Sequence, residues 1–191
     1  MNDPSDKAKL RARLRKRRRA LDAARPDAAR AAAEALPLER LPAFEWFASY
    51  HALGSELDPA PLAARLTRAG KRLALPVTLA ADAPLAFRAW RAGDVPEIDA
   101  FGVPSPPPSA PEVWPGLVIC PLLAFDRAGG RLGQGGGHYD RTIEALRARG
   151  PVFVLGLAYA GQEVEALDME PHDQRLDAIL TENGYTEVRK D

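Results

Sequence analysis

Two continuous apolar segments, LVICPLLAF at residues 117–125 and VFVLGLAYA at residues 152–160, constrain the fold of this chain more than any other feature. Neither alternates apolar with polar residues, so each has the composition of a strand that is buried on both faces of a sheet. The segment between them, YDRTIEALRARG at residues 139–150, is amphipathic and helix-like. Because parallel strands need a crossover connection, this strand, helix, strand order predicts an α/β fold.

The remaining segments continue the alternation. Further strands are expected at FEWFASY, RLALPV, LAFRAW and LDAILTENG, and helices at residues 6–24, 26–36 and 57–71, with a short one at QEVEAL. In the third helix Asp58 is a natural N-cap and Gly70 a natural end. The proline-rich stretch VPSPPPSAPEVWPG is expected to be an irregular surface connection. Together these segments predict a largely parallel sheet flanked by helices.

The first predicted helix is strongly basic. Residues 7–19 carry nine of the 26 Lys and Arg residues and no acidic residue, which leaves the rest of the chain with a net charge of minus nine. Leu10, Leu14 and Leu21 form a narrow apolar stripe on this helix. Beside the stripe, at the edge of whatever the leucines pack against, lie three cations: Lys7, Arg11 and Arg18. Such a segment can bind nucleic acid, a membrane surface or a polyanionic ligand, or it can dock on the acidic body.

Composition excludes other classes of protein. The single cysteine, Cys120, allows neither a disulfide framework nor a cysteine metal site. No apolar run approaches the roughly 20 residues of a membrane-spanning helix, and the densely charged N-terminal segment lacks the apolar region of a secretory signal. We therefore expect a cytoplasmic protein.

A glycine-rich segment, GGRLGQGGGHYDR at residues 129–141, lies between the first apolar run and the helix that follows it. Each glycine costs about 0.5–1 kcal/mol relative to alanine in regular structure, so six of them indicate more than a tight turn. Free backbone N–H groups and the positive end of the helix dipole favour an anion here, and Arg131 adds a fixed charge. The segment matches neither the common P-loop nor the G-x-G-x-x-G dinucleotide pattern.

Other polar residues have two interpretations each. Asp140, in the first helical turn, is either an N-cap or a magnesium ligand beside a phosphate loop. His138 and Tyr139 either stack on a flat ligand or cover the helix end. Glu56 follows a predicted strand and is either a solvated loop residue or part of a site at that edge of the sheet. The pair His172 and Asp173 suggests a metal site or a base, although surface loops also produce such pairs.

Taken together, these segments resemble the 5-formyltetrahydrofolate cyclo-ligase family, also called 5,10-methenyltetrahydrofolate synthetases. The similarity runs in order through nearly the whole chain, over KAKLR, GSELDP, LALPV, FGVP, CPLLAFDRAGGRLGQGGGHYDR and PHDQRLDAILTENG. The glycine-rich segment, combined with the later H-D-x-x-x-D-x-I-x-T-E pattern, is its most specific part. The resemblance implies a single-domain three-layer Rossmann-like fold over residues 1–191, with the basic helix at about residues 5–24 packed on the α/β body.

The resemblance also implies roles for particular residues. ATP would be bound by Lys7, Arg11, Arg131, Leu132, Gly133, Gln134, Gly135, Gly136, Gly137, His138 and Tyr139. Folate would be bound by Glu56, Gln134, Gly135, Gly136, Gly137 and His138. The implied magnesium ligands are Asp140 and Asp173, and the implied catalytic residues are Arg131 and Tyr139. The chain departs from the family pattern at three positions. A glutamate is common at Ser105, an aromatic residue or arginine at Gln134, and an aromatic residue at His138.

The implied activity is ATP- and Mg²⁺-dependent cyclisation of 5-formyltetrahydrofolate to 5,10-methenyltetrahydrofolate, with release of ADP and phosphate through a phosphorylated formyl intermediate. The partners would be these small molecules, with no nucleic acid or membrane, and we expect a monomer. One alternative is another small-molecule phosphotransferase that uses the same glycine loop. The other is a nucleic-acid-binding module, but the basic segment has no aromatic residues for base stacking and the body is acidic.

Overall fold

The computed structural model describes residues 4–91, 93–99 and 101–188 of the chain. Its helices and 3₁₀ turns are α1 (Pro4–Ala24), α2 (Ala28–Ala35), η1 (Leu38–Arg40), α3 (Ala60–Arg68), α4 (His138–Arg147) and η2 (Ala160–Gln162). Its strands are β1 (Trp46–Ala48), β2 (Arg72–Val77), β3 (Ala86–Ala89), β4 (Glu97–Ile98), β5 (Pro104–Ser105), β6 (Leu117–Pro121), β7 (Ala124–Phe125), β8 (Arg131–Leu132), β9 (Phe153–Leu157), β10 (Ala178–Thr181) and β11 (Gly184–Glu187).

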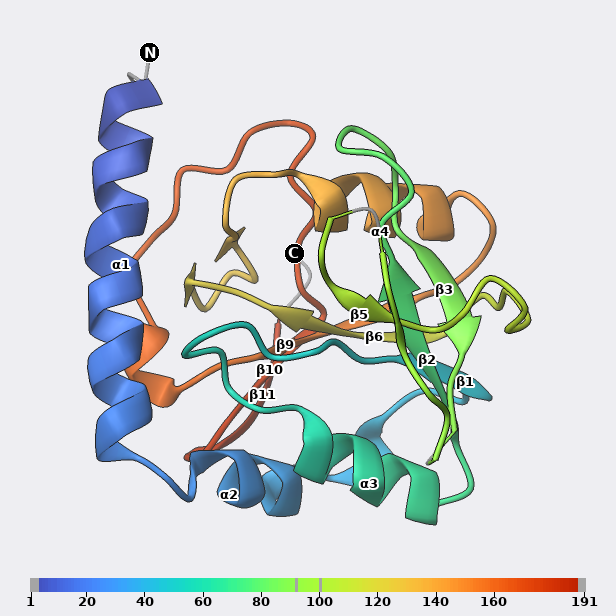
Figure 1. The fold of residues 1–191 in the computed structure, drawn as a ribbon. Helices are drawn as coiled ribbons and strands as arrows, with labels where there is room; N and C mark the ends of the chain where they lie inside the picture. Colours follow the sequence, from blue (N-terminus) through green and yellow to red (C-terminus); the bar gives the residue numbers. More distant parts are fainter. Residues whose placement is uncertain (1–3, 92, 100, 189–191) are drawn as a thin grey trace.

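Within the described residues, seven strands form one sheet in the order β11-β10-β9-β6-β1-β2-β3. The five inner strands are parallel, whereas β3 and β11 at the two edges run antiparallel to their neighbours. Figure 1 shows α2 and α3 on one face of this sheet and α4 on the other. The predicted three-layer α/β fold with a largely parallel sheet is therefore confirmed. That one domain spans all of residues 1–191 stays a prediction, because this range includes residues outside those described.

The core lies on both faces of the sheet, as the two apolar runs require. Leu62 and Leu66 of α3 pack in the same cluster as Phe47 of β1. On the opposite face, Ile143 of α4 packs with Val154 of β9. All four of these aliphatic side chains are fully buried, and burying one contributes about 1.5–3 kcal/mol relative to leaving it exposed.

α1 lies across the carboxyl end of the central strands. Its Leu14 is 4% exposed and packs against Leu123 and Ala124, which follow β6 directly. Leu10 joins this cluster, and Leu21 packs at the edge of the main core. The predicted leucine stripe is thus the docking face of α1. The cations beside it are carried to the end of the sheet at which the loops of an open α/β fold bind ligands.

The structure differs from the predicted elements in four places. The apolar run at 117–125 is not one strand: β6 ends at Pro121, and β7 pairs with β8 in a separate hairpin. The predicted helix at QEVEAL is wrong, because only the turn η2 forms there and Val164 N instead donates to the Phe125 carbonyl. β11 was not predicted. The proline-rich stretch is largely irregular but contributes β5, which pairs with β4.

The cap of α3 also differs slightly from the prediction. Pro59 occupies the N-cap position, and Asp58 Oδ1 accepts a hydrogen bond from Ala60 N at 2.9 Å. Asp58 therefore still accepts a hydrogen bond from a backbone N–H at the start of α3, although it lies one residue before the N-cap rather than at it.

Candidate active site

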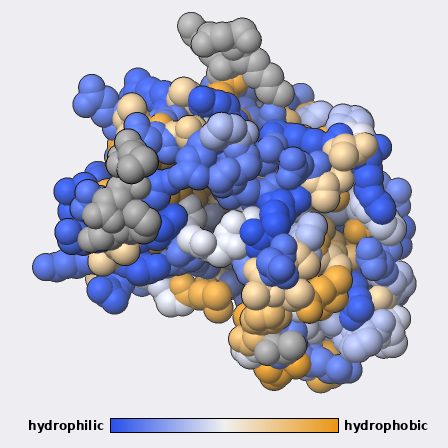
Figure 2. Space-filling view, turned by 90° about the horizontal axis from the view of Figure 1, so that it is seen from above, coloured by the Kyte–Doolittle hydropathy of each residue, from blue (hydrophilic) through white to orange (hydrophobic). Residues whose placement is uncertain are grey.

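The segments that carry the predicted site residues meet at the carboxyl end of the central strands β1 and β6. α1 lies along this end, the β7–β8 hairpin and the glycine-rich loop at residues 133–137 lie beside it, and α4 begins at His138. Figure 2, which looks onto the loops at the top of Figure 1, shows a mostly hydrophilic surface with a hollow near its centre.

Arg131 and Asp140 form a buried ion pair at the base of the glycine-rich loop. Arg131 Nη2 donates to Asp140 Oδ1 at 2.8 Å, and the two side chains are 4% and 18% exposed. The same carboxylate oxygen accepts a hydrogen bond from Gln174 N at 2.9 Å, which brings the segment containing Asp173 beside α4. Arg131 Nε is buried and has no hydrogen-bond partner among the described residues. The guanidinium is therefore held in place by Asp140, and its buried Nε–H has no acceptor among the described residues.

Glu56 is held by α1 rather than solvated. Its Oε1 lies 3.3 Å from Arg18 Nη1, and its Oε2 accepts from Leu53 N at 3.0 Å. The Arg18 and Glu56 side chains are 5% and 7% exposed. Arg18 also donates to Ser55 Oγ and to the Leu122 carbonyl, at 3.3 and 3.4 Å. Burial with several hydrogen bonds is what a buried charge pair needs in order to persist.

Three acids near this pair have raised pKa values. Burial raises the pKa of Tyr139 well above its usual value, and electrostatic interaction with Cys120 and Glu56 raises it further. Burial likewise raises the pKa of Tyr50, with Glu56 and Tyr139 adding to the effect. Burial raises the pKa of the Cys120 thiol to about 11. Tyr139 is therefore a protonated phenol at neutral pH that can donate a hydrogen bond but cannot serve as a base.

The glycine-rich loop rests on the basic side chains of α1. Arg11 Nε donates to the Gly133 carbonyl at 3.2 Å, and Arg15 Nε donates to Gln134 Oε1 at 2.8 Å. A Cβ at Gly135 would lie 3.3 Å from Arg11 Cζ, so the backbone can approach this guanidinium closely only without a side chain. Gly137 has φ +65° at the N-cap of α4, a conformation that favours glycine.

Two residues predicted to bind ATP have contacts of their own. His138 Nδ1 lies 3.3 Å from the Ala83 carbonyl oxygen, so its ring faces the loop after β2. Leu132 pairs with Ala124 in the hairpin and packs in the cluster of Leu14. Its partly buried side chain therefore packs the hairpin against α1.

Lys7 and Asp173 come together through one loop. Lys7 Nζ is ion-paired with Glu170, and its charge lowers the pKa of that carboxyl. Glu170 N donates to Asp173 Oδ2 at 2.7 Å. Asp173 therefore lies between two contacts of the same loop. The next residue, Gln174, donates to Asp140, and Glu170, three residues earlier, pairs with Lys7.

The carboxylates of Asp140 and Asp173 fit a magnesium ion only in part. No group of three or more His, Cys, Asp or Glu side chains within the described ranges is arranged to hold a metal. Mg²⁺ commonly uses one or two protein carboxylates together with substrate phosphates. Asp140 suits this role, because both of its hydrogen bonds use Oδ1 and no described residue donates to Oδ2. Asp173 supplies a second carboxylate on the adjoining segment.

Comparison with known proteins identifies the family of the chain. A model of the 5-formyltetrahydrofolate cyclo-ligase family matches residues 3–182. The chain belongs to this family. The predicted resemblance to the cyclo-ligase family is therefore confirmed, as is the prediction that the chain is an enzyme of this kind.

Individual cyclo-ligases and synthetases are similar over most of their length. The 5-formyltetrahydrofolate cyclo-ligase of Escherichia coli K12 is 37% identical over 131 residues, which is 66% of this chain and 71% of the relative. That of Mycolicibacterium smegmatis is 33% identical over 141 residues, 70% of this chain and 71% of the relative. The solution structure of Aquifex aeolicus 5,10-methenyltetrahydrofolate synthetase has a TM-score of 0.73 and 26% identity, covering 97% of this chain and 94% of that one.

The family resemblance did not identify every residue that shapes this candidate site. Arg18 was placed beside the leucine stripe of α1, but its pairing with Glu56 was not foreseen. Arg15 and Glu170 were not identified, although they contact Gln134 and Lys7. For Arg18, the one signal in the sequence was its helical spacing with Lys7 and Arg11.

No described helix is long and apolar enough to cross a membrane.

Proposed function

We propose that the chain catalyses the ATP- and Mg²⁺-dependent cyclisation of 5-formyltetrahydrofolate to 5,10-methenyltetrahydrofolate, releasing ADP and phosphate. It would act as a cytoplasmic monomer without nucleic-acid partners. The observation that carries the proposal is Arg131, which Asp140 fixes beside the glycine-rich loop with its buried Nε unpaired. A phosphate oxygen is the acceptor that this donor lacks, and a guanidinium suits phosphate geometry.

The proposed chemistry activates a poor leaving group. The formyl oxygen of the folate attacks the γ-phosphorus of ATP, so an O–P bond forms while the bond to ADP breaks. N10 then attacks the formyl carbon, and phosphate leaves with the C–O bonding pair. Loss of the N10 proton completes the methenyl bridge. Phosphoryl transfer depends chiefly on positioning and on stabilising negative charge, rather than on covalent chemistry by the protein.

The residues of this site would divide that work. Arg131 would stabilise charge on the transferred phosphoryl group, while Lys7, Arg11 and the backbone N–H groups of the glycine loop would hold the phosphate chain. Bound at Asp140 and Asp173, Mg²⁺ would neutralise phosphate charge. Lys7 would have to exchange Glu170 for phosphate, since its ammonium is paired with that carboxylate.

The folate end would be held by Glu56 and Tyr139. Glu56, held by Arg18 and by Leu53 N, would accept hydrogen bonds from the N–H groups of the pterin. The protonated hydroxyl of Tyr139 would donate to an oxygen of the substrate, because burial keeps its pKa high.

The test is direct. Purified protein mixed with 5-formyltetrahydrofolate, ATP and Mg²⁺ should give the near-ultraviolet absorbance of the methenyl product, and omission of ATP or Mg²⁺ should abolish the rise. Arg131→Gln should lower kcat by about a hundredfold or more, the magnitude typical of removing one charge-stabilising donor. Asp140→Asn retains an oxygen acceptor for Arg131, so we expect it to lose Mg²⁺-dependent turnover while remaining folded.

Arg40→Gln is the control. Arg40 of η1 also forms an ion pair, with Glu187 of β11, with Nη2 to Oε2 at 3.1 Å. This variant should keep wild-type turnover. Wild-type protein that is folded yet forms no product, or Arg131→Gln with near-normal kcat, would overturn the proposed function.

A further inference from the structure

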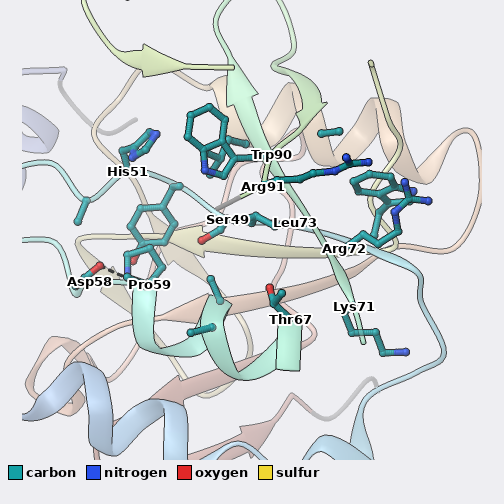
Figure 3. A pocket seen from close by; sticks show the side chains of 18 of the residues that line it. Ser49, His51, Asp58, Pro59, Thr67, Lys71, Arg72, Leu73, Trp90 and Arg91 are labelled. Carbon is teal, nitrogen blue, oxygen red and sulfur yellow. Dashed lines mark hydrogen bonds between the residues drawn. The ribbon is translucent and has the colours of Figure 1, made fainter. Parts of the chain in front are cut away.

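The connection between β2 and β3, residues 78–85, lies beside the start of α4 (Figure 1). On the α3 side of the sheet, these two strands border a cavity of about 690 Å³, and Figure 3 shows Leu73 of β2 in its wall above α3. Over this cavity the strands are not closely packed on the helix. Contacts with α4 therefore matter more for the position of the connection.

Three side chains from the first turns of α4 hold this connection. They contact every second residue from 81 to 85: Thr142 Oγ1 accepts from Leu85 N at 2.8 Å, His138 Nδ1 lies 3.3 Å from the Ala83 carbonyl oxygen, and Arg141 Nη2 donates to the Ala81 carbonyl at 3.1 Å. Of these three side chains, only that of Arg141 also hydrogen-bonds to the glycine-rich loop within the described residues. Arg141 therefore links the two segments.

The contact of Arg141 with the glycine-rich loop is close. Its Nη2 donates to the Gly136 carbonyl at 2.7 Å, and a Cβ at Gly137 would lie 2.7 Å from its Nη1. Because a trans peptide points its C=O and N–H in opposite directions, holding the Gly136 carbonyl also fixes the direction of Gly137 N–H. That N–H lies at the N-cap of α4 and has no acceptor among the described residues. It belongs to the end of the helix that favours an anion.

Packing alone does not account for an arginine at position 141. The Nε atom of Arg141 is buried and has no hydrogen-bond partner among the described residues. Its guanidinium also forms no ion pair in the part of the chain that the structure describes. A buried donor without an acceptor is costly, whereas an aliphatic side chain would fill the same space without that cost. The two carbonyl contacts are therefore what the guanidinium contributes here.

We propose that Arg141 is a positioning residue for the nucleotide, which holds the glycine-rich loop against residues 81–85 in the conformation that receives phosphate. This inference rests on the proposed function, in which backbone N–H groups of the loop bind the phosphate chain of ATP. Arg141 needs no contact with ATP in this role. A loop that is already ordered loses less conformational entropy on binding, so loss of Arg141 lowers the affinity for nucleotide.

The first test measures the order of the loop in the ligand-free chain. Backbone order parameters from ¹⁵N relaxation should be about 0.85 at Gly136 and Gly137 in the wild type, and should fall below about 0.6 in Arg141→Gln. The control Thr142→Val removes the acceptor of Leu85 N but leaves the Gly136 contact in place, so order at Gly136 and Gly137 should keep its wild-type value. Unchanged order in Arg141→Gln, or an equal loss in Thr142→Val, would refute the positioning role.

The second test measures nucleotide binding without turnover. Calorimetric titration with a non-hydrolysable ATP analogue and Mg²⁺ should give a Kd about tenfold higher for Arg141→Gln, as expected if the receptive loop conformation is then populated about a tenth of the time. Thr142→Val should change this Kd less than twofold. So should Arg149→Gln, which removes an equal charge that lies over the Trp114 ring beyond the end of α4. KM for ATP should follow the Kd, while KM for 5-formyltetrahydrofolate changes less than twofold.

The outcomes separate this inference from the proposed function. A wild-type Kd in Arg141→Gln, or equal losses of affinity in Arg141→Gln and Arg149→Gln, would overturn the positioning role even if the wild type forms the methenyl product. A wild type that binds no nucleotide would overturn both. Conversely, nucleotide affinity that falls only in Arg141→Gln, in a chain that forms no methenyl product, would uphold the positioning role and reject only the proposed reaction.

Discussion

The ion pair of Arg18 and Glu56 lies almost wholly out of solvent, with side-chain exposures of 5% and 7%. We expect Arg18→Met to destabilise the fold by about 3–5 kcal/mol, because it leaves the Glu56 carboxylate buried without a counter-charge. Urea unfolding followed by circular dichroism measures the change. The double variant Arg18→Met/Glu56→Gln should recover at least half of the loss, since no uncompensated charge remains.

A matched control for this prediction is available on α2. Arg30 pairs with Asp27 on the surface, with side-chain exposures of 66% and 78%. Arg30→Met should leave the unfolding midpoint unchanged, because exposed pairs contribute little. Similar losses of stability in Arg18→Met and Arg30→Met would show that burial does not determine how much the Arg18–Glu56 pair contributes.

Among the elements, those built from long apolar runs were predictable from the sequence and those that depend on distant pairing were not. The apolar composition of RLALPV and VFVLGLAYA predicts buried strands, and the structure places β2 and β9 there. β7 and β8 are two residues each and exist because they pair with one another. QEVEAL is not helical because its backbone bonds to the hairpin instead, through Val164 N and the Phe125 carbonyl. Local propensity contains no information about such partners.

The same limit applies to the candidate site. The glycine-rich loop and the cationic edge of α1 were predictable, since each is a local pattern with a physical cause. The contacts that assemble them are not local: Arg11 and Gly133 are 122 residues apart in sequence, and Lys7 and Glu170 are 163 apart.

α1 should be the element whose loosening affects nucleotide binding most directly. Leu14 is 4% exposed and anchors this helix to Leu123 and Ala124. Leu14→Ala should cost about 2–4 kcal/mol and should speed amide hydrogen exchange along α1. KM for ATP should rise severalfold, because Arg11 reaches the glycine loop only from a docked helix. The neighbouring Arg13→Ala, at an exposed position, is the control and should change neither quantity; rapid exchange with an unchanged KM would separate α1 from ATP binding.

For the molecule as a whole, its buried neutral acids set the response to alkaline pH. Cys120, Tyr50 and Tyr139 each interact electrostatically with Glu56, and burial raises the pKa of each, that of Cys120 to about 11. In the unfolded chain the same groups ionise nearer their ordinary values, about 8.5 for cysteine and about 10 for tyrosine. The unfolded chain then binds fewer protons than the folded one once pH passes about 8.5. Linkage requires the free energy of unfolding to fall as pH rises through this range.

Cys120 alone should account for about 2 kcal/mol of that loss between pH 8 and pH 10.5, since each unit of pKa shift is worth 1.36 kcal/mol. Urea unfolding at a series of pH values should therefore show stability falling more steeply in the wild type than in Cys120→Ala. The comparison uses the slope with pH rather than the absolute stability, so the small cavity left by the substitution does not affect it. Parallel slopes in the two proteins would mean that the Cys120 thiol ionises in the folded chain near its ordinary pKa. Ionising a group at this buried position would then cost less free energy than its burial implies.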